Sequence, residues 1–96
     1  MPTIVFNLYV AGTTSYNKQL LQLYEEACDH CIKEGKYRIE VIDLLKKPDL
    51  AEKYKVLATP TISRLTPTPE KRIIGKVNGE QAVSAIKFLI DDLSIS

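Results

Sequence analysis

The sequence predicts an α/β fold with a mixed sheet and the element order βαβαββα. Three observations lead to this prediction. Residues 3–10 carry apolar side chains on both alternating faces, which indicates a central strand covered on two sides. A long amphipathic segment and a second strand-like run follow, as in a strand–helix–strand unit. Farther along, the Thr59-Pro60 bond lies just before an apolar strand, where one class of α/β folds places a cis proline.

The first half of the chain is expected to form a parallel pair of strands. Gly12 permits a turn after the first strand, and one of the hydroxyl residues 13–15 can cap a helix that runs to about Glu34. Residues 37–44 then form the second strand, and the single crossover implies a right-handed connection. The buried stripe of the helix contains Leu20, Tyr24, Ala27 and Cys31, flanked by Leu21, Cys28 and Ile32.

The next part of the chain is expected to add a short helix and an antiparallel hairpin. Pro48 suits the first position of a helix over residues 48–55, because a missing N–H costs nothing there. Residues 61–66 and 71–77 form two strands. The turn between them contains two prolines, which forbid helix and favour a hairpin.

Asn78 and Gln81 have the spacing of a capping box, and they open a last amphipathic helix. The apolar stripe of this helix is Ala82, Val83, Ile86, Leu89, Ile90 and Leu93. With Pro60 at the start of the third strand, the complete order is the thioredoxin-like arrangement. A cis bond before Pro60 would fix the tight turn there.

Length and composition are those of one compact domain over residues 1–96, with 45% apolar and 26% charged residues. No apolar run approaches the roughly 20 residues of a membrane span, and the N-terminus does not resemble a signal peptide. We therefore expect a soluble, cytoplasmic protein with no membrane partner. The formal net charge of +1 argues against bulk binding to nucleic acid.

Positive charge is concentrated in the middle of the chain. The segment from Lys46 to Lys76 contains eight basic and three acidic residues, a net charge of +5, while residues 1–45 and 77–96 are each net −2. Such a segment can meet an acidic protein surface or a phosphate. The alternative is an ordinary solvated basic face.

Cys28-Asp29-His30-Cys31 is a Cys-x-x-Cys sequence, but its position argues against redox chemistry. A reactive pair lies at a helix N-terminus, where the helix dipole lowers the thiol pKa. This pair falls in the fourth turn of the first helix, where both sulfurs can pack as small apolar groups. A zinc site would need a second Cys/His pair, which only another chain could supply. We expect no metal and no cofactor, and redox sensing is the remaining alternative.

Residues 13–16 occupy the place where relatives of this fold bind glutathione or hold a nucleophile. A hydroxyl group there could donate to a thiolate, but the sequence positions no base that would activate it. Helix capping explains the same residues. The sequence therefore predicts no catalytic residue and a protein that is not an enzyme.

Four motifs carry a resemblance to the KaiB family of circadian clock proteins. They are Leu8-Tyr9-Val10-Ala11-Gly12-x-Thr14, Val41-Ile42-Asp43-x-Leu45-Lys46-x-Pro48-x-Leu50-Ala51-Glu52, Leu57-Ala58-Thr59-Pro60-Thr61 and Arg72-Ile73-Ile74-Gly75. The motifs occur in order over nearly the whole chain and at the right separations.

The resemblance implies a non-enzymatic protein that binds a KaiC-type ATPase and modulates its phosphorylation and ATPase cycle. It further implies metamorphism, in which a ground-state fold with a rearranged C-terminal half is the alternative to the thioredoxin-like fold. Self-association to a dimer or tetramer is implied as well. The functional alternatives are a family member that acts in stress or redox adaptation without a clock, and a docking module for a sensor histidine kinase.

The resemblance also implies site residues. Lys55 matches a family lysine and Arg64 conserves the charge of another, both in the partner-facing region, and Arg72 is expected to bind the partner with them. Structural roles are expected for Gly12, Pro60 and Gly75.

The sequence departs from the family pattern at four other positions. Glu40 and Gln19 stand where the family has a lysine and an arginine, and an opposite charge at a contact can lower affinity. Ile86 and Phe88 replace a glycine and an aspartate. Because glycine inside a helix costs about 1 kcal/mol relative to alanine, we expect this chain to favour the thioredoxin-like form, in which residues 80–93 are one helix.

Overall fold

The computed structural model describes residues 3–94, and its elements follow the predicted order βαβαββα. The sheet has the strand order β2-β1-β3-β4. β1 pairs parallel with β2 and antiparallel with β3, and β3 pairs antiparallel with β4. The strands are β1 (Ile4–Val10), β2 (Tyr37–Asp43), β3 (Thr61–Thr66) and β4 (Lys71–Ile74). The prediction of a mixed sheet is confirmed.

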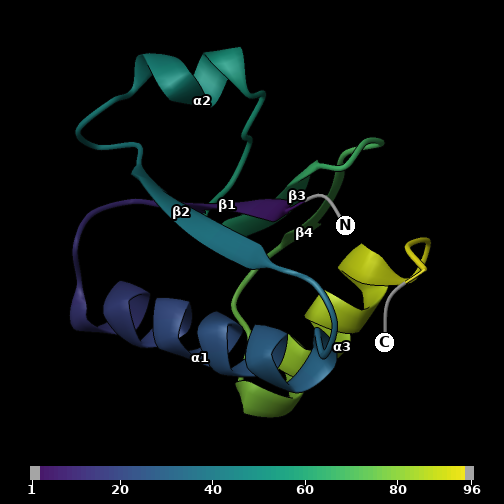
Figure 1. Cartoon of the computed structure of the whole chain (residues 1–96). Coiled ribbons are helices and arrows are strands. Elements are labelled where there is room, and N and C mark those ends of the chain that lie inside the picture. Colours follow the sequence, from purple (N-terminus) through teal and green to yellow (C-terminus); the bar gives the residue numbers. More distant parts are fainter. Residues whose placement is uncertain (1–2, 95–96) are drawn as a thin grey trace.

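The helices lie on opposite sides of this sheet (Figure 1). α1 (Ser15–Cys31) and α3 (Gly79–Ile90) pack against each other and cover one face, while the short α2 (Asp49–Lys53) lies beyond the other face. Within residues 3–94, no helix combines the length and the apolar character that a membrane crossing requires.

β1 is the centre of the core, and all seven of its residues are buried. Ile4, Phe6, Leu8 and Val10 belong to the apolar cluster that includes the inward stripes of α1 and α3. The predicted stripe of α1 is shifted slightly, since Cys28 is fully buried and Cys31 only half-buried. The prediction of a central strand covered on both faces is confirmed.

The face of the sheet below α2 is polar although it is also buried. Asn7, Thr61 and Ser63 are each at most 1% exposed. The amide nitrogen of Asn7 donates to the hydroxyl of Tyr9 at 3.0 Å, and the ring of Tyr9 lies 5.7 Å from the ring of Tyr54, just after α2. The contact between these two rings therefore helps to attach the end of α2 to the sheet.

Local signals set the ends of the long helices. Thr14 caps α1 by accepting from the N–H of Asn17 at 3.1 Å. The capping box at α3 is confirmed, because Asn78 and Gln81 each bond the backbone N–H of the other. α1 ends at Cys31, three residues before the predicted Glu34, since the backbone is already extended at the following residue.

The other differences concern short elements. α2 spans five residues rather than the eight predicted, because the chain turns out of the helix after Lys53. β4 ends at Ile74 rather than at Val77, because Gly75 adopts φ +116° and donates its N–H to the carbonyl of Pro60 at 2.9 Å. The Thr59-Pro60 bond is cis, as predicted, and the two X-Pro bonds of the β3–β4 turn are cis as well.

Arg64 holds the C-terminal end of α3 against β3. Its guanidinium is 0% exposed and donates to the carbonyls of Leu89 and Pro69, each at 2.7 Å, and to both carboxylate oxygens of Asp92. A cation is favourable at this end of a helix, where backbone carbonyls lack intrahelical partners. In this fold the guanidinium of Arg64 is buried and fully engaged with groups of the same chain, which argues against the predicted contact with a partner.

Lys71 makes a second contact of the same kind from β4. Its ammonium donates to the carbonyl of Phe88 at 2.7 Å and pairs with Asp91, and it lies 4.2 Å from the centre of the Phe88 ring. Two cations from the hairpin thus bind the last turn of α3.

We expect Arg64→Ala to lower the free energy of unfolding by about 3 kcal/mol, because it leaves a cavity and removes the partners of buried carbonyls. Arg38→Ala is the matched control. Arg38 pairs with Glu40 at 3.3 Å, but the two side chains are 61% and 52% exposed, so the change should stay within about 0.5 kcal/mol. Urea unfolding of both variants measures the difference, and equally small losses would contradict the structural role of Arg64.

The stability of the fold should also depend on the ionisation of Asp92. The hydrogen bond from Arg64 lowers the pKa of Asp92 from 3.8 to about 2. Because the pKa is lower in the folded state, the stabilisation is complete above about pH 4 and is lost as the pH falls toward 2. We expect Asp92→Asn to flatten the decline of stability in this interval. Urea titrations at several pH values measure it, and the same pH dependence in both proteins would refute the assignment.

Candidate protein-binding surface

The most exposed large apolar side chain among the described residues lies next to α2. Leu57 is 93% exposed, more than any other large apolar residue described. It lies in the α2 corner, which we define as residues 49–59, from the start of α2 to the residue before Pro60. A hollow of about 460 Å³ in this corner is lined by Ala51, Glu52, Lys55, Val56 and Leu57. An exposed apolar patch with a polar rim is typical of a protein-interaction site.

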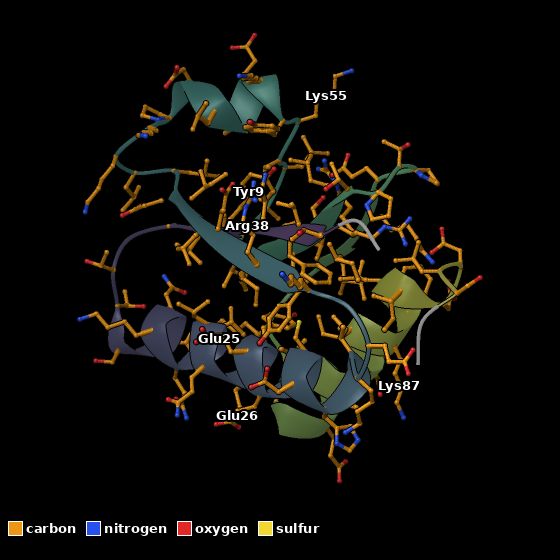
Figure 2. All side chains as sticks on the ribbon, in the orientation of Figure 1. Tyr9, Glu25, Glu26, Arg38, Lys55 and Lys87 are labelled. Carbon is orange, nitrogen blue, oxygen red and sulfur yellow. The ribbon has the colours of Figure 1, made fainter. Side chains whose placement is uncertain are left out.

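Lys55 lies at the edge of the same hollow and is exposed. Its side chain extends away from the sheet at the end of α2 (Figure 2). Its φ of +55° makes it the one non-glycine residue with positive φ in residues 3–94. This left-handed conformation turns the chain sharply after α2.

Backbone hydrogen bonds fix the path of the corner. The N–H of Val56 donates to the carbonyl of Ala51 at 2.8 Å, and the N–H of Lys55 donates to that of Glu52 at 3.2 Å. Farther on, the hydroxyl of Thr61 donates to the carbonyl of Ala58 at 2.6 Å. The exposed residues therefore sit on a backbone with a defined conformation.

Arg72 reaches the corner from β4. Its guanidinium donates to the carbonyls of Tyr54 and Lys55, each at 3.0 Å, and to Glu70 at 2.6 Å from Nη2 and 3.0 Å from Nε. The hydroxyl of Ser63 donates to the same carboxylate. The side chain of Arg72 is only 26% exposed, so most of its charge is directed inward.

The basic residues of the middle segment differ in their surroundings, and exposed Lys76 lies over the ring of Tyr16. Arg64, Lys71 and Arg72 pair with acidic residues. Within the described part of the chain, no ion pair involves four exposed lysines around α2, which are Lys46, Lys47, Lys53 and Lys55. These four lysines place positive charge in and beside the α2 corner, which also carries the exposed acidic residues Asp49 and Glu52.

Hydrogen bonds fix the conformation of the loop between β1 and α1, where redox proteins of this fold carry thiols. Gly12 adopts φ +90°, and its N–H donates to Asp43 at 2.9 Å. Asp43 also accepts from the N–H of Leu45, and the amide of Asn17 donates to the carbonyl of Gly12 at 2.8 Å. The bond from Gly12 is the main reason that the pKa of Asp43 is lowered. A Cβ at position 12 would meet Leu45 at 3.2 Å, which supports a structural role for Gly12.

The two thiols of α1 differ in burial, since Cys28 is buried and Cys31 is half-buried. Cys28 is 0% exposed, and burial raises its pKa to about 12. Burial also raises the pKa of Cys31, whose Sγ donates to the carbonyl of Val83 at 3.9 Å. Among residues 3–94, no three His, Cys, Asp or Glu side chains come together in a group that could hold a metal ion. These surroundings fit structural thiols.

The structure brings some of the predicted site residues together and separates others. Lys55 and Arg72 meet at the α2 corner, whereas Arg64 lies inside the protein. Pro60 is buried next to the α2 corner, and its carbonyl accepts a hydrogen bond from the N–H of Gly75. Sequence reasoning missed Leu57 and Glu70. Glu70 lies two positions before Arg72, and alternate residues of an extended segment point to the same side, which is a signal that could have identified it.

The sequence matches a known family along most of its length. A family model described as the KaiB domain matches residues 7–88. The circadian clock oscillator protein KaiB of Prochlorococcus marinus subsp. pastoris is 41% identical over 95 residues, which cover 98% of this chain and 88% of that protein. KaiB of Nostoc punctiforme is 40% identical over 93 residues, which cover 96% of this chain and 88% of that protein.

Solved structures with the same fold include a domain of SasA and several thioredoxins. The N-terminal domain of SasA from Synechococcus elongatus matches with a TM-score of 0.78 at 18% identity, covering 100% of this chain and 91% of that one. Chloroplastic thioredoxin z matches with a TM-score of 0.65 at 18% identity, covering 93% and 80%. At these identities the likeness concerns the fold alone, and it confirms the thioredoxin-like arrangement.

We expect Cys28 to react with iodoacetamide at pH 8 at least a hundredfold more slowly in the folded chain than in urea. Burial keeps the thiol protonated and excludes the reagent, and the thiolate is the reacting form. Mass spectrometry of the alkylated peptides measures the rate, with half-buried Cys31 as the internal comparison. Similar rates for Cys28 in the folded and unfolded chain would contradict the structural assignment.

Proposed function

The chain belongs to the KaiB family, and we propose on that premise that it is a cytoplasmic, non-enzymatic regulatory protein that binds a KaiC-type ATPase and modulates its phosphorylation and ATPase cycle. The curated relatives are named as clock oscillator proteins, and they match along almost the whole chain. The binding surface in this proposal is the α2 corner.

The exposure of Leu57 is the observation that carries the proposal. A leucine that is 93% exposed contributes nothing to the core, and burying it against a partner would remove its apolar surface from water. Lys55 lies beside it in the same hollow. The partner surface that fits this corner combines an apolar recess with acidic side chains.

Three features support binding rather than chemistry at the usual redox position of this fold. The loop after β1 reads Ala-Gly-Thr-Thr-Ser and contains no thiol. Thr14 in this loop is engaged in capping α1. The two cysteines of the chain lie on α1, and burial raises the pKa of both, which opposes thiolate formation.

We expect Lys55→Glu and Leu57→Ser each to weaken binding of the ATPase about tenfold or more, which corresponds to roughly 1.4 kcal/mol. The first change reverses a charge at the rim, and the second removes the apolar contact. Lys87→Glu is the matched control, because Lys87 is exposed on α3 and lies far from the α2 corner (Figure 2).

The measurement is co-elution of the chain with the KaiC homologue of its host in the presence of ATP, followed for a day, with affinities from a titration. Absence of a complex with the unchanged chain would refute the proposed function. Unchanged affinity of both corner variants, or an equal loss in the Lys87 variant, would refute the α2 corner as the binding surface.

A further inference from the structure

We propose that Arg72 is a positioning residue, which holds the segment from Lys55 to Leu57 in the conformation that a partner recognises and does not itself contact the partner. This inference rests on the proposed function, in which the α2 corner is the binding surface. It changes the role predicted for Arg72 from its sequence, which was direct contact.

The atoms that Arg72 binds are the first basis for this role. Two of its nitrogens donate to the carbonyls of Tyr54 and Lys55, at 3.0 Å each. These carbonyls belong to the backbone just after α2, and the residues involved are 17 and 18 positions away from Arg72 in the sequence. The guanidinium therefore ties the exposed corner to β4, an element of the sheet.

The backbone of the α2 corner explains why these hydrogen bonds from Arg72 matter. α2 has five residues, none of them buried, so packing contributes little to its position. Lys55 adopts a left-handed conformation that is unfavourable for a residue with a Cβ. A hydrogen bond to the carbonyl of Lys55 stabilises this conformation, on which the direction of both the Lys55 and the Leu57 side chains depends.

The charge of Arg72 is already satisfied inside the protein. Glu70 accepts from both Nε and Nη2, and Glu70 itself accepts from the hydroxyl of buried Ser63. This arrangement fixes the plane of the guanidinium, so that its remaining donors point to the two carbonyls. A lysine at position 72 would keep the charge but could not form this planar fork.

A direct contact and a positioning role predict different results for Arg72→Lys. If Arg72 contacts the partner through its charge, Arg72→Lys should retain most of the affinity and Arg72→Gln should lose it. If Arg72 positions the corner, both variants should weaken binding by a similar factor, about tenfold. Glu70→Gln, which leaves Arg72 in place but loosens it, should cause a smaller loss of the same kind.

A double-mutant cycle with Lys55→Gln separates the two roles further. Independent contacts give multiplied losses, whereas residues that act through one another do not. In the positioning role, Lys55→Gln should weaken binding much less in the Arg72→Lys background than in the unchanged chain. Multiplied losses, or full affinity of Arg72→Lys, would overturn the proposal.

Amide hydrogen exchange in the free protein tests the same role without a partner. We expect exchange at Val56, whose N–H bonds to the carbonyl of Ala51, to become at least tenfold faster in Arg72→Lys and in Glu70→Gln. Lys76→Gln is the control, because its ammonium lies over the ring of Tyr16, away from the corner. Circular dichroism establishes that each variant is folded.

The binding measurements and the exchange measurement together distinguish failure of the proposed function from failure of the positioning role. If the unchanged chain binds no ATPase, the proposed function fails, and the exchange rates alone decide whether Arg72 holds the corner. Unchanged exchange at Val56 in both variants would overturn the positioning role, whatever the affinities show.

Discussion

The burial of β1 on both faces is the constraint on which the rest of the structure depends. One face is apolar and is covered by α1 and α3, so hydrophobic burial holds those helices in place. The other face presents Asn7 and Tyr9, which require polar or aromatic neighbours once water is excluded. The element above that face is therefore attached by specific hydrogen bonds and ring contacts, and its geometry depends on a few side chains.

The division of the basic residues follows from the same architecture. Arg64 and Lys71 project from the hairpin toward the carbonyl end of α3, where positive charge is favourable. Arg72, one residue along β4, projects to the opposite face and meets the backbone after α2. Neighbouring residues on one strand thus contact two different helices, and the four lysines around α2 remain exposed on the surface.

Much of the fold could be predicted from local signals. The strand β1, the capping box at Asn78 and the cis bond before Pro60 each depend on a few adjacent residues, and the structure confirms them. The burial of Arg64 could not be predicted, because its partner Asp92 is 28 residues away and approaches only when α3 docks. The exposure of Leu57 was equally hidden, since an apolar residue before a strand is usually expected inside.

The contacts of Arg64 and Lys71 with the last turn of α3 affect how the chain unfolds. If α3 leaves the sheet, Arg64 loses the Leu89 carbonyl and the Asp92 carboxylate, which satisfy its buried guanidinium in the folded protein. Undocking of α3 should therefore also loosen the hairpin, because the same guanidinium binds the Pro69 carbonyl in the β3–β4 turn. We expect the part of the chain from β3 to α3 to unfold as one cooperative unit.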